Sequence, residues 1–159
     1  MTPEYEQYCI EQAETWLVKV RKLVGYATKL GESAAAQLAR ADNLRGIDYS
    51  AVRVQTSPSA DAIPNAIIMH EEMGASFKEL AETATARVKE ASSALACMDD
   101  PVEAMCLQLY YVEAYATWEH VCVAMDYSYD GMMKLRRRAM LHAYEVMPHQ
   151  ERDPQHRAI

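Results

Sequence analysis

The sequence predicts an all-α protein, in which a long N-terminal helical hairpin is followed by a C-terminal domain of three helices. Glycine (5) and proline (6) are scarce among the 159 residues and 50% of the chain is hydrophobic, a balance that favours helix over sheet. Between residues 13 and 44, apolar or small side chains recur at alternating spacings of three and four, as in a coiled-coil-like seam. After residue 98 a series of helix-start signals indicates shorter helices.

The first helix is expected to run from residue 3 to residue 44. Thr2 followed by Pro3 suits a helix start, because proline is well tolerated at the first helical position. Gly31 lowers helix propensity and is a candidate position for a break. The seam of this helix is formed by Ala13, Trp16, Val20, Leu23, Ala27, Leu30, Ala34, Ala41 and Leu44.

Residues 46–60 lose the period and collect Gly, Ser, Thr and Pro, so they are expected to form a connecting loop. A second helix is expected from Asp61 to residue 98, with its stripe formed by Ile63, Ile67, His70, Phe77, Ala84, Val88, Ala91 and Leu95. His70 is interpreted as a satisfied core or interface histidine. The two helices are expected to form an antiparallel hairpin that packs along Trp16, Leu23, Leu30, Ile67, Phe77 and Val88. The same seam could instead pair with a second copy of the chain, so a homodimer through these helices is left open.

A clear helix start divides the chain into two predicted domains. Asp100 suits the N-cap, Pro101 the first helical position and Glu103 the first turn. We therefore predict an oligomerisation or partner-binding hairpin over residues 1–99 and a helix-turn-helix domain over 100–147. The polar residues 148–159 are expected to form a disordered tail.

The C-terminal domain is expected to place its second and third helices around a short turn. Thr117 and Ser128 are candidate N-caps of these helices, and Asp126 occupies the turn position, where aspartate tolerates left-handed backbone angles. The third helix is expected to end near Val146. Apolar residues should clamp the two helices around the small residue Cys122, namely Val121, Met125, Tyr127, Met132 and Leu135.

In a helix-turn-helix the second helix of the motif enters the major groove and contacts bases mainly through its N-terminal turns. The residues predicted to face double-stranded DNA here are Ser128, Tyr129, Asp130, Met133, Lys134, Arg137 and Arg138. The lysine and arginines suit phosphates or guanine edges. The alternative interpretation is that this basic run is only the solvated face of an amphipathic helix.

Residues 101–147 resemble region 4 of bacterial sigma factors. The pattern is carried by Pro101, Leu107 or Leu109, Tyr110 and Tyr111, Thr117-Trp118-Glu119, Val121 and Leu135-Arg136-Arg137. The stretch YVEAYATWEHV from Tyr111, followed by MDYS from Met125, is similar to the autolysin-regulator-like and late-gene transcription regulators of prophages in Gram-positive bacteria. Residues 52–61 resemble a loop of the same group. Two departures concern His120, where the pattern usually has Glu, and Gly131, where it favours Arg.

The resemblance implies a sequence-specific, DNA-binding transcription regulator of phage or prophage origin, with host RNA polymerase as an open candidate for a further partner. Two alternatives remain. One is a phage DNA-packaging component of small-terminase type, although its DNA-binding unit usually comes first in the chain. The other is a helical interaction protein, favoured by the net charge of −7.

No enzyme, cofactor or metal is expected. The sequence contains no phosphate-binding glycine loop, no metalloprotease motif and no nucleophile elbow. The pair His142 and Glu145 is a weak metal signal by itself. The four cysteines (Cys9, Cys97, Cys106 and Cys122) show no paired spacing and are interpreted as buried free thiols. We expect a cytoplasmic location in a bacterial host cell and no membrane partner, because no run approaches a membrane span.

Overall fold

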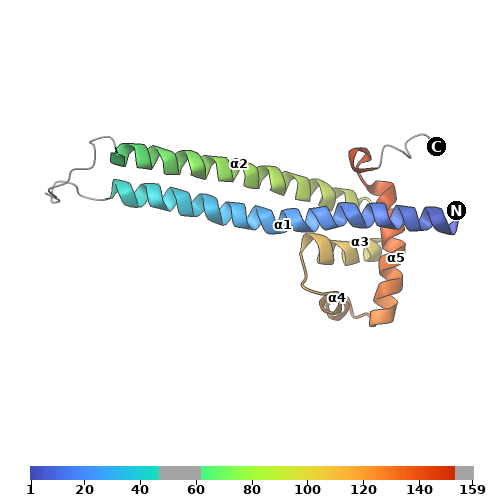
Figure 1. Cartoon of the computed structure of the whole chain (residues 1–159). Coiled ribbons are helices and arrows are strands. Elements are labelled where there is room, and N and C mark those ends of the chain that lie inside the picture. Colours follow the sequence, from blue (N-terminus) through green and yellow to red (C-terminus); the bar gives the residue numbers. More distant parts are fainter. Residues whose placement is uncertain (47–61, 153–159) are drawn as a thin grey trace. The chain divides into compact units, whose positions relative to one another are not determined.

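A computed structural model describes residues 1–46 and 62–152, and every regular element in these ranges is helical. The predicted all-α class is therefore confirmed. Figure 1 shows the elements in chain order. They are α1 (Pro3–Arg45), α2 (Ala62–Ala96), α3 (Pro101–Leu107), the π-helix η2 (Gln108–Val112), α4 (Trp118–Met125), α5 (Tyr129–Val146) and the 3-10 turn η3 (His149–Glu151).

Both long helices form close to the predicted limits. The break considered at Gly31 does not occur, and α1 continues through it. A Cβ at Gly31 would meet nothing within 4 Å, so this glycine costs α1 only propensity, about 1 kcal/mol relative to alanine. The second helix ends at Ala96, two residues before the predicted limit. Apart from Gly46, the predicted loop over 46–60 lies outside the described residues, as does Asp61.

The chain divides into two compact units. Unit 1 comprises Met1–Gly25 and Thr85–Ile159, and unit 2 comprises Tyr26–Ala84. The boundary predicted between residues 99 and 100 is therefore not a boundary between compact units. The reason is packing: the first part of α1 and the last part of α2 share one core with the C-terminal helices.

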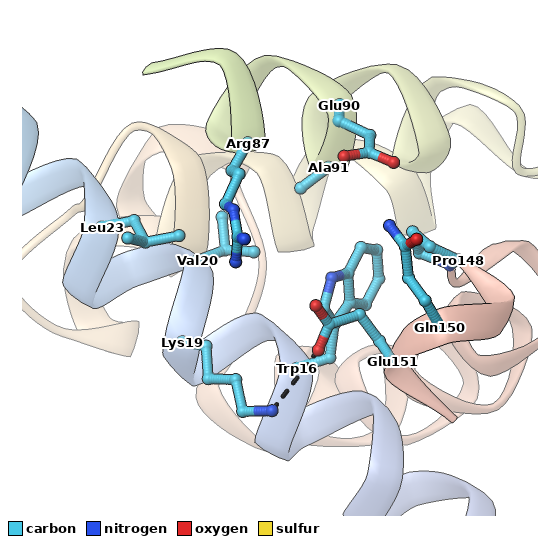
Figure 2. Close-up of a pocket in the computed structure, with 10 residues that line it drawn as sticks. All are labelled: Trp16, Lys19, Val20, Leu23, Arg87, Glu90, Ala91, Pro148, Gln150 and Glu151. Atoms are coloured by element: carbon cyan, nitrogen blue, oxygen red, sulfur yellow. Dashed lines mark hydrogen bonds and ion pairs between the residues drawn. The ribbon is translucent and has the colours of Figure 1, made fainter. Parts of the chain in front are cut away.

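The start of the predicted disordered tail is ordered within unit 1, which corrects that expectation for residues 148–152. Arg152 Nη2 donates to the backbone carbonyls of Glu145 at 2.9 Å and Met147 at 3.3 Å. The turn η3, α1 and α2 together line a cavity of about 510 Å³ (Figure 2). At this cavity Lys19 Nζ of α1 forms an ion pair with Glu151 Oε2 of η3 at 3.4 Å. Residues 153–159 lie outside the described ranges.

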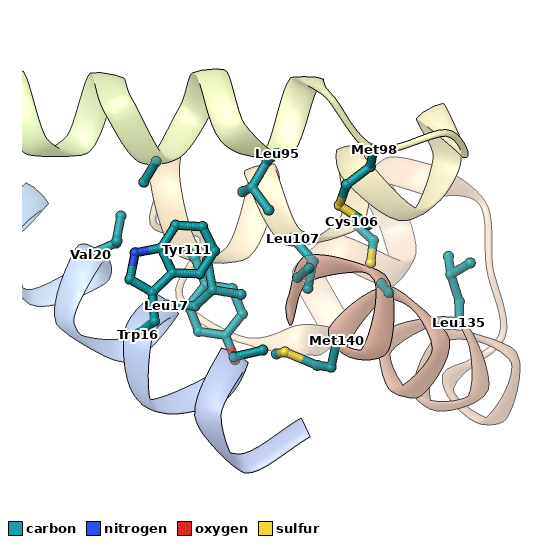
Figure 3. Packing of buried hydrophobic residues seen from close by; sticks show 14 of the residues in the cluster. Trp16, Leu17, Val20, Leu95, Met98, Cys106, Leu107, Tyr111, Leu135 and Met140 are labelled. Atoms are coloured by element: carbon teal, nitrogen blue, oxygen red, sulfur yellow. The ribbon is translucent and has the colours of Figure 1, made fainter. Parts of the chain in front are cut away.

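The core of unit 1 is built from apolar side chains on all five α-helices and η2 (Figure 3). Its fully buried members include Leu17 of α1, Leu95 of α2, Leu107 of α3, Tyr111 of η2 and Met140 of α5. Burying each such side chain contributes about 1.5–3 kcal/mol of transfer free energy. Packing of this kind places the first part of α1, up to Gly25, in the same unit as the C-terminal helices.

Burial has a direct effect on two ionisable members of this core. It raises the pKa of the Cys106 thiol from 9.0 to about 12 and the pKa of the Tyr111 phenol from 10.0 to about 12. Between about pH 9 and pH 12 the unfolded chain releases these protons and the folded chain retains them. Their contribution to stability is therefore fully present below this window and is lost as the pH rises through it.

We expect the free energy of unfolding to fall above about pH 9, by about 1.4 kcal/mol per pH unit for each group between its two pKa values. The measurement is urea unfolding at a series of alkaline pH values. The double variant Cys106→Ala, Tyr111→Phe should show a shallower decline than the unmodified protein. Equal slopes for both proteins would contradict this assignment.

The cysteines only partly follow the prediction. Cys9, Cys106 and Cys122 are buried free thiols as expected, whereas Cys97 is exposed. Cys97 follows the last residue of α2, off the stripe that faces the core, and its Sγ donates to the backbone carbonyl of Ser93 at 3.4 Å. The small, apolar side chain of Cys97 was therefore not enough to predict burial.

Unit 2 consists of the remaining parts of α1 and α2. Its buried positions are mainly small residues, because two helices alone cannot cover large side chains on all sides. Gly74 illustrates the close approach, since a Cβ there would lie 3.1 Å from the side chain of Leu38.

The predicted role of His70 is confirmed, as its Nδ1 lies 2.7 Å from Oε1 of Gln37. Of the six predicted hairpin contacts only Trp16 is buried; the other five are half-buried, namely Leu23, Leu30, Ile67, Phe77 and Val88.

Candidate nucleic-acid interface

The helix α4 begins and ends at the residues that the sequence indicated. Thr117 is the N-cap, and its Oγ1 accepts from the amide of His120 at 3.4 Å. The helix ends at Asp126, whose backbone is left-handed with φ 57° and ψ 47°. This conformation lets the amide of Tyr127 donate to the carbonyl of Cys122 at 3.0 Å and closes the helix end. The chain is thereby redirected into α5 within three residues.

The start of α5 is also fixed locally. Ser128 is the N-cap, and its Oγ accepts from the amide of Gly131 at 3.2 Å. A Cβ at position 131 would lie only 3.0 Å from that oxygen, which gives glycine a physical reason at a position where the sigma pattern favours arginine. Of the residues predicted to clamp α4 against α5, Val121, Cys122, Met132 and Leu135 are buried and Met125 is half-buried. Tyr127, which was predicted to belong to the clamp, is instead 40% exposed in the turn.

Most of the residues predicted to face DNA share the exposed side of the first turns of α5. Ser128, Tyr129, Asp130 and Lys134 are exposed. Lys134 forms no ion pair with any residue that the structure describes. Met133 differs, because it is half-buried and packs against the core of unit 1. The N-terminal end of α5 therefore offers one accessible ammonium group, flanked by hydroxyl and carboxylate groups.

Two arginines of the basic run pair with carboxylates of α1. Arg136 Nη2 lies 2.5 Å from Glu14 Oε1, and Arg137 Nη2 lies 3.6 Å from Glu6 Oε2. The second pair is long, and the Arg137 side chain is 60% exposed, so the pair is a weak surface contact that a stronger anion could replace. Both pairs join segments more than 100 residues apart, as for Arg136 and Glu14 (122 residues), so no local sequence pattern indicates them.

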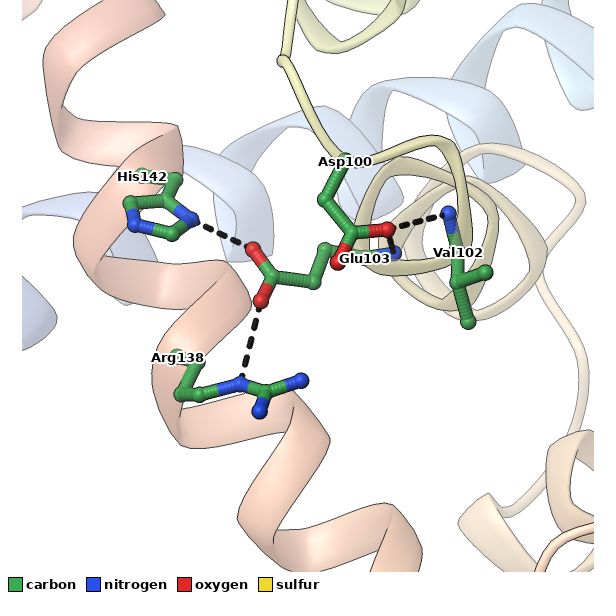
Figure 4. Close-up of polar contacts among 5 residues, drawn as sticks. All are labelled: Asp100, Val102, Glu103, Arg138 and His142. Carbon is green, nitrogen blue, oxygen red and sulfur yellow. Dashed lines mark hydrogen bonds and ion pairs between the residues drawn. The ribbon is translucent and has the colours of Figure 1, made fainter.

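Arg138 has a structural partner that local patterns did not indicate. Glu103 is 2% exposed, and its carboxylate accepts from Arg138 Nε at 3.1 Å and contacts His142 Nδ1 at 2.5 Å (Figure 4). From the sequence, Glu103 was expected to be only an acidic residue in the first turn of a helix. A usable signal was the spacing of four between Arg138 and His142, which places both side chains on one side of α5.

This contact holds the guanidinium of Arg138 at its Nε, while 65% of the side chain stays exposed. The weak metal signal of His142 with Glu145 has no counterpart in the structure, because His142 faces Glu103 instead. Among the described residues, no group of three or more His, Cys, Asp or Glu side chains could hold a metal ion.

Comparisons with known proteins do not extend these observations. No family model, curated protein or solved structure matches this chain. Within the described ranges, no helix has the length and apolar character needed to cross a membrane.

Proposed function

We propose that this chain is a sequence-specific, DNA-binding transcription regulator of the phage or prophage type, in which α4 and α5 act as a helix-turn-helix. The observation that carries the proposal is the capped, three-residue connection from Asp126 to Ser128. It leaves the first turns of α5 exposed with Tyr129, Asp130 and Lys134 on their surface. A helix presented by its N-terminal turns suits the major groove.

The basic residues of α5 differ in their ion pairs, and we expect them to contribute differently to DNA binding. Lys134 and Arg137 are the candidate phosphate contacts, because one has no ion pair in the described structure and the other has only a weak one. Arg138 would contact DNA while its Nε stays bound to the carboxylate of Glu103. Tyr129 and Asp130 lie at the end of α5 where base edges are contacted in such motifs.

A second candidate function is a helical interaction protein. It is supported by the net charge of −7, by the pairing of Arg136 and Arg137 with glutamates, and by exposed apolar side chains in unit 2. These side chains are Leu38, Ile68, Met69, Met73 and Leu80. They would serve a partner helix or a second copy of the chain, and host RNA polymerase stays a candidate partner on the first hypothesis.

The test of DNA binding starts from selection of tight-binding duplexes out of a random pool, followed by affinity measurements over a range of salt concentrations. The slope of log affinity against log salt is negative. In the double variant Lys134→Ala, Arg137→Ala we expect its magnitude to decrease by about 1.8, or about 0.9 for each lost phosphate contact. Neither side chain is buried, so circular dichroism should show an unchanged fold.

The matched control is Arg87→Ala, Lys89→Ala, which removes two exposed charges from α2 and should leave the slope unchanged. An unchanged slope in the folded Lys134→Ala, Arg137→Ala variant would show that the basic run is a solvated surface. The interaction protein would then become the leading hypothesis.

A further inference from the structure

A stack of arginines and aromatic rings lies beside the start of α4. The rings of Tyr110 and Trp118 are parallel to within 15°, with their centroids 4.2 Å apart. The guanidinium of Arg21 lies 4.2 Å from the Tyr110 ring centroid, and that of Arg136 lies 5.1 Å from the Trp118 ring. Each guanidinium is therefore held against a ring, where cation–π attraction limits its motion.

These side chains line an open pocket of about 450 Å³. Three cations, Arg21, Lys22 and Arg136, face it, against one carboxylate, Glu14. This excess of positive charge stands out in a chain with a net charge of −7. The cavity of Figure 2 differs, because its two cations are balanced by two glutamates. The pocket beside α4 therefore favours an anion.

The cations of the pocket have donors to spare. Arg21 uses Nη1 to donate to the backbone carbonyl of Tyr110, and Arg136 uses Nη2 for Glu14. The Nε of Arg136 has no hydrogen-bond acceptor in the part of the chain that the structure describes, but it is buried, so contact with a ligand falls to the rest of this side chain, which is 28% exposed. Lys22 is exposed and forms no ion pair with a described residue. Fixed guanidinium forks with unused donors match the oxygen atoms of a phosphate.

We propose that this pocket binds a phosphate ester, and that its ligand is a backbone phosphate of the DNA bound by α4 and α5. The inference rests on the proposed function for the source of the phosphate. Trp118 begins α4 and Arg136 belongs to α5, so the pocket adjoins both helices of the proposed motif. Arg21 and Lys22 add α1 to the contact surface. The shared chemistry would equally fit a free mononucleotide, and the experiment separates the two sources.

The first arm measures duplex affinity over a range of salt concentrations for the double variant Arg21→Ala, Lys22→Ala. For a DNA phosphate, the salt slope should fall by up to about 1.8, whereas the control Arg87→Ala, Lys89→Ala should keep the original slope. Because loss of Arg21 removes a packing contact, the single variant Lys22→Glu is the second test. Its exposed side chain can change without affecting folding, and its duplex affinity should also fall.

The second arm uses small probes and does not depend on DNA binding. The chain has two tryptophans, so NMR resolves the indole N–H of Trp118 from that of the buried Trp16. Titration with deoxyadenosine monophosphate and with inorganic phosphate should shift the Trp118 signal saturably, and Lys22→Glu should weaken the response. Deoxyadenosine, which lacks the phosphate, should not reproduce it.

The outcomes are distinct. A reduced salt slope in Arg21→Ala, Lys22→Ala would show that the pocket binds a phosphate of the DNA backbone. Saturable nucleotide binding with an unchanged slope assigns it to a free phosphate ester and overturns the DNA source. If the unmodified protein binds no duplex, the proposed function fails, and the NMR arm alone decides whether the pocket binds phosphate. No saturable shift together with an unchanged slope overturns the pocket as a phosphate site.

Discussion

Leu17→Ala is expected to lower the free energy of unfolding of unit 1 by about 2–5 kcal/mol, although it lies more than 80 residues before the first C-terminal helix at Pro101. Leu17 is 0% exposed and belongs to the same core as Leu107 and Met140. Its truncation removes apolar contacts and leaves a cavity that rigid helices fill only in part. The loss should therefore extend to α4 and α5.

The measurement combines urea unfolding with hydrogen exchange of peptides from α5. Protection of α5 should fall in Leu17→Ala because the two segments unfold together. Val123→Ala is the control: Val123 lies on α4 itself but is 83% exposed, and its change should stay within about 0.5 kcal/mol. If α5 keeps full protection in Leu17→Ala, residues 100–147 fold independently, as the sequence boundary at 99/100 suggested.

Removing both partners of Glu103 is expected to be the most harmful polar change. The double variant Arg138→Ala, His142→Ala leaves a carboxylate that is 2% exposed without either of its partners, at a cost of about 3–5 kcal/mol. The reverse change, Glu103→Leu, leaves Arg138 and His142 to be solvated by water, since their side chains are already 65% and 50% exposed. It should therefore cost less.

Stability is again measured by urea unfolding at neutral pH. Adding Glu103→Leu to the double variant should restore much of the lost stability, because the uncompensated buried charge disappears. An equal cost for Glu103→Leu and for the double variant would mean that packing alone, and not the buried charge, accounts for the effect. The same series informs the DNA test, since any binding defect of an Arg138 variant has to be corrected for lost folding.

Locally encoded features of this protein could be predicted from its sequence. The N-caps Asp100, Thr117 and Ser128 and the left-handed Asp126 stand where they were expected. In each case the group that satisfies the backbone lies within about four residues, so the interaction is already implied by spacing. The all-α class follows from the same local propensities together with the apolar periodicity of the long helices.

The tertiary structure decided which segments form one unit and which charges are used in packing. Arg138 meets Glu103 across 35 residues, His142 meets it across 39, and Arg136 meets Glu14 across 122. Helical periodicity specifies the face of a residue but not the helix that this face meets. Pairing across such separations depends on how the helices pack around the core, and that packing is a collective property of many buried side chains.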